Sequence, residues 1–440
     1  MKRNIAWHWS AQMAGFALLA IFSALYTFDQ NLYFLILKTM GFDPFLHPFV
    51  DGEYIVSGVE CWKKNIDVYV ANPCDILHRP NAYSPLWLRA TFLPADRRWI
   101  NPLGLGLAIA FLTSLFLLPK AKSGFETMVL TLATISTMTV FAIERANIDL
   151  VMFLLAMLAA LGFTHGRRGR LLAYGPVLLA GFLKFYPLVL FVFSFAERPR
   201  KFLGINILAG LACALFIWRF LPELAEMAPN IPRGPYFTDA FGAVNLPYGL
   251  CQIFFAVTGF DGANAPWARH LPTLTLLLLV ADTARRAVTL SQESGFDRSL
   301  SRLPDWDRTL LVTGCVLICG CFFAGQSIEY RGIHFLFILP GLLALTRGDE
   351  ASGLGRHTVV MILFLMWGEC LRQLIALGAG SLGLREMPAV AIDLGFRLFR
   401  ELVWWRVISR LGAILIWFVR TSDTGEWALA VLRRTRQGAR

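Results

Sequence analysis

Long apolar stretches dominate the chain, and short polar segments separate them, a pattern that is typical of membrane proteins. Because one membrane-spanning helix needs about 20 predominantly apolar residues, each long stretch is a candidate span. We expect spans at residues 11–28, 102–118, 125–143, 150–163, 202–221, 268–284, 309–325, 333–346 and 358–378, with a last one ending near 418. With a broken segment counted separately, the pattern predicts about eleven crossings. The expected fold is an all-α polytopic membrane protein with a single transmembrane domain over residues 1–440.

The broken segment covers residues 171–196, where Lys184-Phe185-Tyr186-Pro187 interrupts an apolar stretch. Proline ends a helix at the residue before it, so we expect two half-helices that enter and return as a re-entrant pair. Non-helical backbone at membrane depth is tolerated only where it is buried in protein or lines a polar cavity. Lys184, at the tip of this pair, is therefore predicted to point into a cavity.

Composition and charge predict how the helices are oriented. The sequence has 56% hydrophobic and 16% charged residues and a formal net charge of +11. In a polytopic protein an excess of Lys and Arg marks cytoplasmic loops. The sequence contains no basic patch interleaved with exposed aromatic residues, so nucleic-acid binding is not expected. The Arg-rich loop 285–308 is therefore predicted to be cytoplasmic, whereas 29–101 and 222–267 form the first and second external loops. The first external loop and the start of 395–410 are expected to lie along the interface.

The first external loop is also where chemistry is expected. Ionisable residues near the membrane interior are costly and are functional candidates by default. The predicted topology gathers such residues on the external side: Asp51, Glu53, Arg145, Asn147, Lys184, Tyr186, Glu329, Tyr330, Arg331 and His334. Carboxylates and cations together suit an anionic substrate and a general base.

Short motifs in a fixed order carry a more specific signal. They are Asp51 with Tyr54, Asp67-Val68-Tyr69, Tyr83-Ser84-Pro85-Leu86-Trp87, Arg145-Ala146-Asn147, Lys184-Phe185-Tyr186-Pro187 and Tyr330-Arg331. In this order they resemble the GT-C superfamily of glycosyltransferases, and more narrowly glycosyltransferase family 87. The chain departs from the family pattern at Asn65, where a Gly is usual, at Val68, where a Pro is usual, and in the acidic Glu144. These departures bear on the identity of the substrate.

The resemblance implies a GT-C-like helix bundle and a sugar transfer at the outer face of a bacterial inner membrane. A mannose, or another hexose or pentose, would move from a polyprenyl-phosphate-linked donor to a hydroxyl of a lipid or glycan acceptor, with inversion. Asp51 would be the general base, and Lys184, Arg331 and Arg145 would bind the donor phosphate. The expected substrate-binding residues are Glu53, Tyr54, Tyr83, Asn147, Tyr186, Tyr330 and His334. No metal ion or other cofactor is expected.

Structural explanations compete with these roles. Asp51 is also suited to cap an interfacial helix, because Asp is a favoured N-cap residue. Asp29, Asp43 and Glu53 are alternative bases.

The basic and aromatic residues have competing explanations as well. Lys184 could snorkel to the membrane surface, Arg145 could pair with Glu144 or Asp149, and Arg331 could pair with Glu329. The aromatic residues are equally suited to anchor the protein at the interface.

The loop also holds Cys61 and Cys74, and an oxidising compartment would permit a disulfide between them, although the spacing alone does not establish it. Two other functions remain open at this stage. A lipid or solute transporter or flippase would also use broken helices and buried charges, and an accessory membrane protein would need no active site.

Overall fold

The computed structural model describes residues 9–42, 44–45, 47–94, 96–259, 266–348, 352–383 and 387–438. Asp43, one of the alternative bases, lies outside the described residues. The described chain is almost entirely helical. Its extended structure is a short antiparallel pairing of β1 (Ala240–Phe241) with β2 (Ser327–Ile328).

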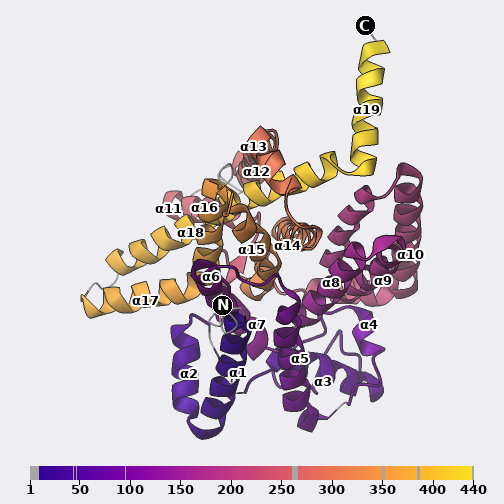
Figure 1. Ribbon diagram of the computed structural model, residues 1–440. Helices are drawn as coiled ribbons and strands as arrows, with labels where there is room; N and C mark the ends of the chain where they lie inside the picture. Colours follow the sequence, from indigo (N-terminus) through magenta and orange to yellow (C-terminus); the bar gives the residue numbers. More distant parts are fainter. Residues whose placement is uncertain are drawn as a thin grey trace, which may run out of the picture.

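The first part of the chain forms helices that lie together at the lower end of the molecule in Figure 1. They are α1 (Ser10–Phe28), α2 (Gln30–Thr39), α3 (Val50–Lys63), α4 (Pro85–Leu88), η1 (Arg97–Trp99), α5 (Ile100–Ser114) and η2 (Leu115–Leu117). Side-chain caps explain where two of them begin. Asp29 accepts a hydrogen bond from the Leu32 amide at the start of α2, and Ser84 accepts one from the Leu86 amide at the start of α4.

The middle of the chain forms the next helices, with β1 between η4 and α11. They are α6 (Gly124–Thr134), α7 (Thr137–Glu144), α8 (Asp149–Thr164), α9 (Gly166–Lys184), η3 (Tyr186–Ala196), α10 (Pro199–Met227), η4 (Ala228–Asn230), α11 (Asn245–Thr258) and η5 (Pro266–His270). The C-terminal part adds α12 (Leu271–Ser291), α13 (Ser294–Ser301), α14 (Asp305–Phe323), η6 (Glu329–His334), α15 (Phe335–Leu345), α16 (Ser352–Met366), α17 (Gly368–Ser381), α18 (Met387–Arg420) and α19 (Asp423–Gly438).

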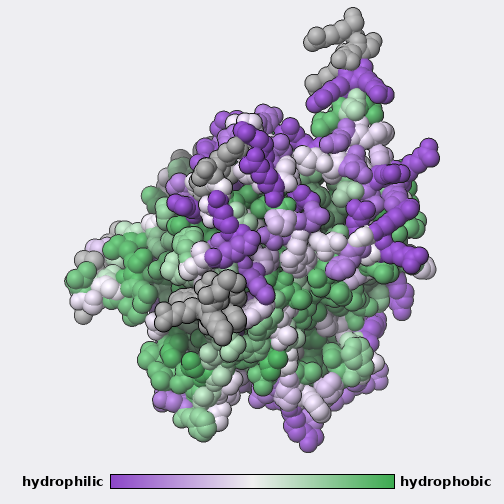
Figure 2. Space-filling view, in the orientation of Figure 1, coloured by the Kyte–Doolittle hydropathy of each residue, from purple (hydrophilic) through white to green (hydrophobic). Residues whose placement is uncertain are grey.

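Six helical segments of the described chain are long and apolar enough to cross a membrane, and a bent pair makes up to seven. They are Ser10–Phe28, Arg97–Leu117, Gly124–Glu144, Pro199–Asn230, Asp305–Phe323 and Pro388–Arg420, with Gly353–Met366 and Gly368–Ser381 meeting at 64°. Figure 2 shows largely hydrophobic surface between two ends that carry more hydrophilic residues. These features indicate an integral membrane protein.

The predicted count of about eleven crossings is higher than the number of full-length spans in the described residues. The expected span 150–163 is the helix Asp149–Thr164, and the second half of the broken segment is the helix Tyr186–Ala196. Both are apolar but fall below the length of a straight crossing. The sequence therefore located both apolar segments correctly.

The helix map differs in two further places. The expected continuous helix 125–143 is interrupted between α6 and α7, where the Ser136 hydroxyl accepts a hydrogen bond from the Thr139 amide and starts a new helix. The segment 395–410, expected to begin as a separate interfacial piece, is part of one continuous helix, α18, in which Arg400 and Glu401 are fully buried. Buried partners, which the sequence does not reveal, keep these charges inside the protein.

The chain reverses direction at Phe185, as the Lys184-Phe185-Tyr186-Pro187 interruption predicts. Phe185 has a positive φ of 57°, and the helices on either side of it lie against each other. The rings of Tyr174 in α9 and Phe191 in η3 stack with their centroids 5.5 Å apart. Lys184 is therefore the last helical residue before a tight turn, with a side chain that is only 8% exposed.

The main core lies where α8, α14, α15 and α18 meet. The Phe153 ring of α8 stacks on Phe337 of α15 at 4.1 Å, and Trp404 of α18 stacks on Phe241 of β1 at 4.2 Å. Gly332 in η6 packs against Met138 of α7, and a Cβ there would overlap the Met138 sulfur. This close packing brings η6 along α7, where the Tyr330 ring also lies 5.5 Å from Phe141, and the polar residues described next follow the end of that helix.

Candidate active site

Asn147 is the centre of a buried polar cluster in the turn between α7 and α8. Its amide nitrogen donates to Asp51 Oδ2 at 2.7 Å, and its oxygen accepts from the Asp149 amide at 2.9 Å and from Lys184 Nζ at 3.3 Å. A carboxylate can only accept and an ammonium can only donate, so these partners fix the orientation of the amide. One fully buried side chain thus bridges Asp51 and Lys184.

Asp51 is placed by hydrogen bonds between the start of α3 and the end of α7. The first amides of a helix lack partners within it, and here the end of α7 supplies them. The Phe49 amide donates to the Glu144 carbonyl at 2.6 Å, and the Asp51 and Gly52 amides donate to the Arg145 carbonyl at 3.0 and 3.2 Å. Phe49, not Asp51, occupies the cap position of α3. The carboxylate of Asp51 is therefore available for other contacts.

Arg79 is the second partner of Asp51. Its guanidinium lies 3.4 Å from Asp51 Oδ1, whereas it makes two shorter contacts of 2.9 Å to the Asp75 carboxylate. It also stacks over the Tyr54 ring at 4.4 Å. Because Arg79 is held mainly by Asp75, Oδ1 of Asp51 is only weakly engaged, and the Asp51 side chain is 17% exposed.

Asp149 organises the cationic side of the cluster. Its Oδ2 lies 2.6 Å from Lys184 Nζ and 3.6 Å from Arg331 Nε, and its Oδ1 accepts from the Tyr186 hydroxyl at 2.8 Å. The Tyr186 oxygen lies 2.7 Å from His334 Nε2, and since its single proton goes to Asp149, the histidine donates. Two cations share one fully buried carboxylate, which leaves a local excess of positive charge.

Aromatic rings enclose the Lys184 ammonium. Its nitrogen lies 5.6 Å from the Tyr83 ring centroid and 5.4 Å from that of Tyr330. Tyr54 packs beside Tyr83 at 5.3 Å, and its hydroxyl accepts from the Ala82 amide at 2.7 Å. Burial raises the pKa of Tyr54 to about 12, so this hydroxyl stays protonated and fastens the segment that carries Tyr83.

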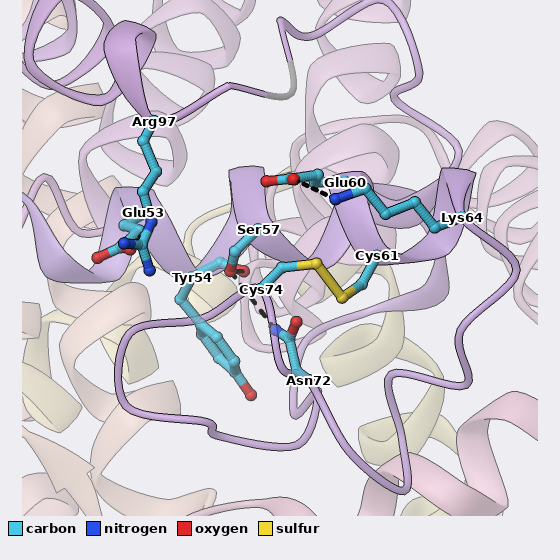
Figure 3. Close-up of a disulfide and its surroundings, with 9 residues drawn as sticks. All are labelled: Glu53, Tyr54, Ser57, Glu60, Cys61, Lys64, Asn72, Cys74 and Arg97. Carbon is cyan, nitrogen blue, oxygen red and sulfur yellow. Dashed lines mark hydrogen bonds and ion pairs between the residues drawn. A yellow bond between two sulfur atoms is a disulfide. The ribbon is translucent and has the colours of Figure 1, made fainter.

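Glu53 lies apart from this cluster. It follows Asp51 by two residues and therefore points to another side of α3. Its carboxylate lies 3.2 Å from His47 and 3.6 Å from Arg97, the second of which is drawn in Figure 3. Burial raises its pKa, against the opposing effect of His47. In this structure Glu53 joins the segments before α3 and α5.

Arg145 also takes a different place from the one expected. Its guanidinium lies 3.3 Å from the Glu144 carboxylate, which is the structural alternative considered above. It also lies 4.0 Å from the Phe45 ring. Its backbone carbonyl, as described above, holds the start of α3. Arg145 therefore reaches the Asp51 environment through its main chain.

Three residues of the cluster were not selected from the sequence: Asp75, Arg79 and Asp149. Asp149 offered a signal, because a carboxylate that opens a wholly apolar helix has to find a buried partner. Asp75 and Arg79 offered only a four-residue spacing in a loop, which is common and uninformative.

An apolar cavity of about 460 Å³ adjoins the cluster. It lies among α1, α2, α5, α6 and α7, three of whose segments are candidate spans. Its lining includes Tyr33, Phe49 and Glu144, the last two being the residues that join α3 to α7. The cavity therefore runs from the apolar zone of the bundle to within two residues of Asp51.

Cys61 and Cys74 form a disulfide, which links α3 to the following loop (Figure 3). In the described part of the chain no group of three His, Cys, Asp or Glu side chains is placed to hold a metal ion.

The fold and this cluster define a polytopic integral membrane protein with a buried polar site at one end of its helices. No family model, curated protein or solved structure matches the chain.

Proposed function

We propose that this protein is a membrane glycosyltransferase that moves a sugar from a polyprenyl-phosphate-linked donor to a hydroxyl of a lipid or glycan acceptor. The observation that carries the proposal is the bridge through Asn147, which connects the partly exposed Asp51 carboxylate to the buried Lys184 ammonium, while Arg331 lies beside the same Asp149 carboxylate as Lys184. Transfer of a sugar from a phosphate requires a base for the acceptor and fixed positive charge for the leaving group.

In the proposed reaction the acceptor oxygen attacks the anomeric carbon while its proton passes to Asp51. The bond between the anomeric carbon and the phosphate oxygen breaks, and its electron pair stays on the phosphate. Lys184 and Arg331 stabilise this charge, since together they exceed the single negative charge of Asp149. Attack opposite the leaving phosphate with one base gives inversion at the anomeric carbon.

The apolar cavity and the disulfide support the lipid donor and the orientation. The cavity offers an apolar path for an isoprenoid chain that ends beside the Asp51 helix. The Cys61–Cys74 disulfide is expected in an oxidising compartment, which favours a site on the outer face of a bacterial inner membrane. The clustered basic residues of 285–308 favour a cytoplasmic position for the opposite end. We extend the proposal to a GT-C-like bundle with a re-entrant α9–η3 pair.

The test is sugar transfer by the purified protein in lipid nanodiscs, with a panel of radiolabelled polyprenyl-phosphate sugars. Asp51→Asn keeps the size of the side chain but removes the base, so we expect transfer to fall by about 10²-fold or more. Glu60→Gln is the matched control, because Glu60 lies on the same helix and makes a surface pair with Lys64 at 2.6 Å. Unchanged transfer by Asp51→Asn would exclude Asp51 as the base. Absence of transfer with every donor would exclude the proposed function.

A further inference from the structure

A second polar site lies at the end of the bundle opposite the Asn147 cluster. Two adjoining hollows of about 230 and 530 Å³ share Lys122 and Arg347 in their walls. They lie where α6, α14 and α16 begin and α15 ends. α14 separates the two ends of the molecule, and its 19 residues correspond to about 28 Å, close to the apolar thickness of a bilayer.

The walls of these hollows are basic. Arg302 lines the smaller hollow and Arg356 the larger one, in addition to the shared Lys122 and Arg347. Arg347 is held in place by a bidentate salt bridge to Glu126, in which both hydrogen bonds are 2.7 Å long. Among the described residues, no ion pair is formed by the other three cations.

Among the described residues, the acidic side chains near the hollows do not neutralise the positive charge of these four cations. Glu126 is 3% exposed, and besides Arg347 it accepts a hydrogen bond from the Lys122 amide at 2.7 Å. Asp307 is half-buried at the start of α14. Among the described residues four cations therefore face two carboxylates, one of which already holds Arg347 in place. Asp349 and Glu350 follow Gly348 in the sequence and lie outside the described residues.

From this geometry we infer that the two hollows bind a phosphate ester, and that its source is the headgroup of an anionic membrane lipid. A guanidinium held in place, with exposed cations beside it, suits a phosphate that carries negative charge at all physiological pH values. Basic pockets between membrane helices on the side with excess Lys and Arg are the usual place for such headgroups. The larger hollow is of the size that holds a small polar ligand. This site is independent of the proposed sugar transfer.

The test is native mass spectrometry of the purified protein in detergent with graded amounts of phosphatidylglycerol, with phosphatidylcholine as the neutral comparison. We expect the wild type to retain phosphatidylglycerol selectively. The double variant Lys122→Gln/Arg356→Gln should weaken this binding by about tenfold or more, since each cation near a headgroup contributes strongly.

The charge-matched control is Arg285→Gln/Arg286→Gln. These two residues pair with Asp282 on the exposed face of α12, and their loss should leave lipid retention unchanged. Equal retention by the wild type and Lys122→Gln/Arg356→Gln would overturn the assignment, as would an equal loss in the control. Competition by soluble glycerol phosphate at a similar concentration would instead assign the site to a soluble phosphate ester and overturn the membrane-lipid source.

Discussion

Asp149 is the residue on which the candidate site depends most, because it is the one carboxylate between Lys184 and Arg331. Removing one member of a buried ionic group leaves the others without a partner in a poorly hydrated environment, at a cost of about 3–5 kcal/mol. We therefore expect Asp149→Asn to lower the free energy of unfolding by this amount, measured by SDS titration in mixed micelles. Adding Lys184→Met should recover part of the loss, since it removes one of the unpaired cations.

A matched control exists on the surface. Asp282 is also a carboxylate shared by two arginines, Arg285 and Arg286, but its side chain is 42% exposed. Exposed pairs contribute about 0–1 kcal/mol, so Asp282→Asn should have a small effect. A similar loss of stability in the two variants would show that burial does not set the importance of Asp149.

At the scale of elements, Arg400 connects the long helix α18 to the segment that carries Arg331. Arg400 is fully buried, and its guanidinium pairs with Glu369 of α17 and lies 2.9 Å from Glu329, the first residue of η6. It also donates to the Thr238 carbonyl at 2.5 Å, just before β1. One side chain therefore fastens three elements around the start of η6.

We expect Arg400→Gln to lower the free energy of unfolding by about 3 kcal/mol or more, because Glu329 and Glu369 would remain buried without their cation. Arg397→Gln is the control on the same helix, about one turn earlier. Arg397 pairs with Asp393 at 2.6 Å, and its side chain is 20% exposed. That variant should lose less than about 1 kcal/mol. Equal losses, measured by the same titration, would contradict the role of Arg400 as the fastening residue.

At the scale of the whole molecule, the two polar ends should face opposite sides of the membrane. Arg98 lies near the start of α5 with a side chain that is 88% exposed, and Arg285 on α12 is 70% exposed. In intact cells we expect a membrane-impermeant maleimide to label Arg98→Cys but not Arg285→Cys, with the wild type as the background. Permeabilised cells should label both. The reverse pattern would place the Asp51 cluster in the cytoplasm and contradict the proposed orientation.

The reversal at Phe185 shows how far local sequence reasoning reached. A proline after Lys184-Phe185-Tyr186 ends a helix for steric reasons that act within a few residues, so the turn could be placed before the structure was known. The gathering of Asn147, Lys184, Tyr186, Arg331 and His334 also followed from counting helices and turns. The interruption of 125–143 at Ser136 did not, because a serine within an apolar run is compatible with both a continuous and a broken helix.

The sequence by itself determined the class of protein, the apolar segments and the gathering of most candidate site residues at one end of the bundle. These properties depend on the free energy of transferring side chains from water to lipid, which is a property of each segment on its own. Only the tertiary structure decided which charged side chains contact one another. It placed Asp149 between two cations, fixed Arg79 on Asp75, and turned Glu53 away from Asp51 towards His47. Ion pairs between distant segments depend on how the helices pack and on which charges remain buried together, and a one-dimensional pattern does not contain that information.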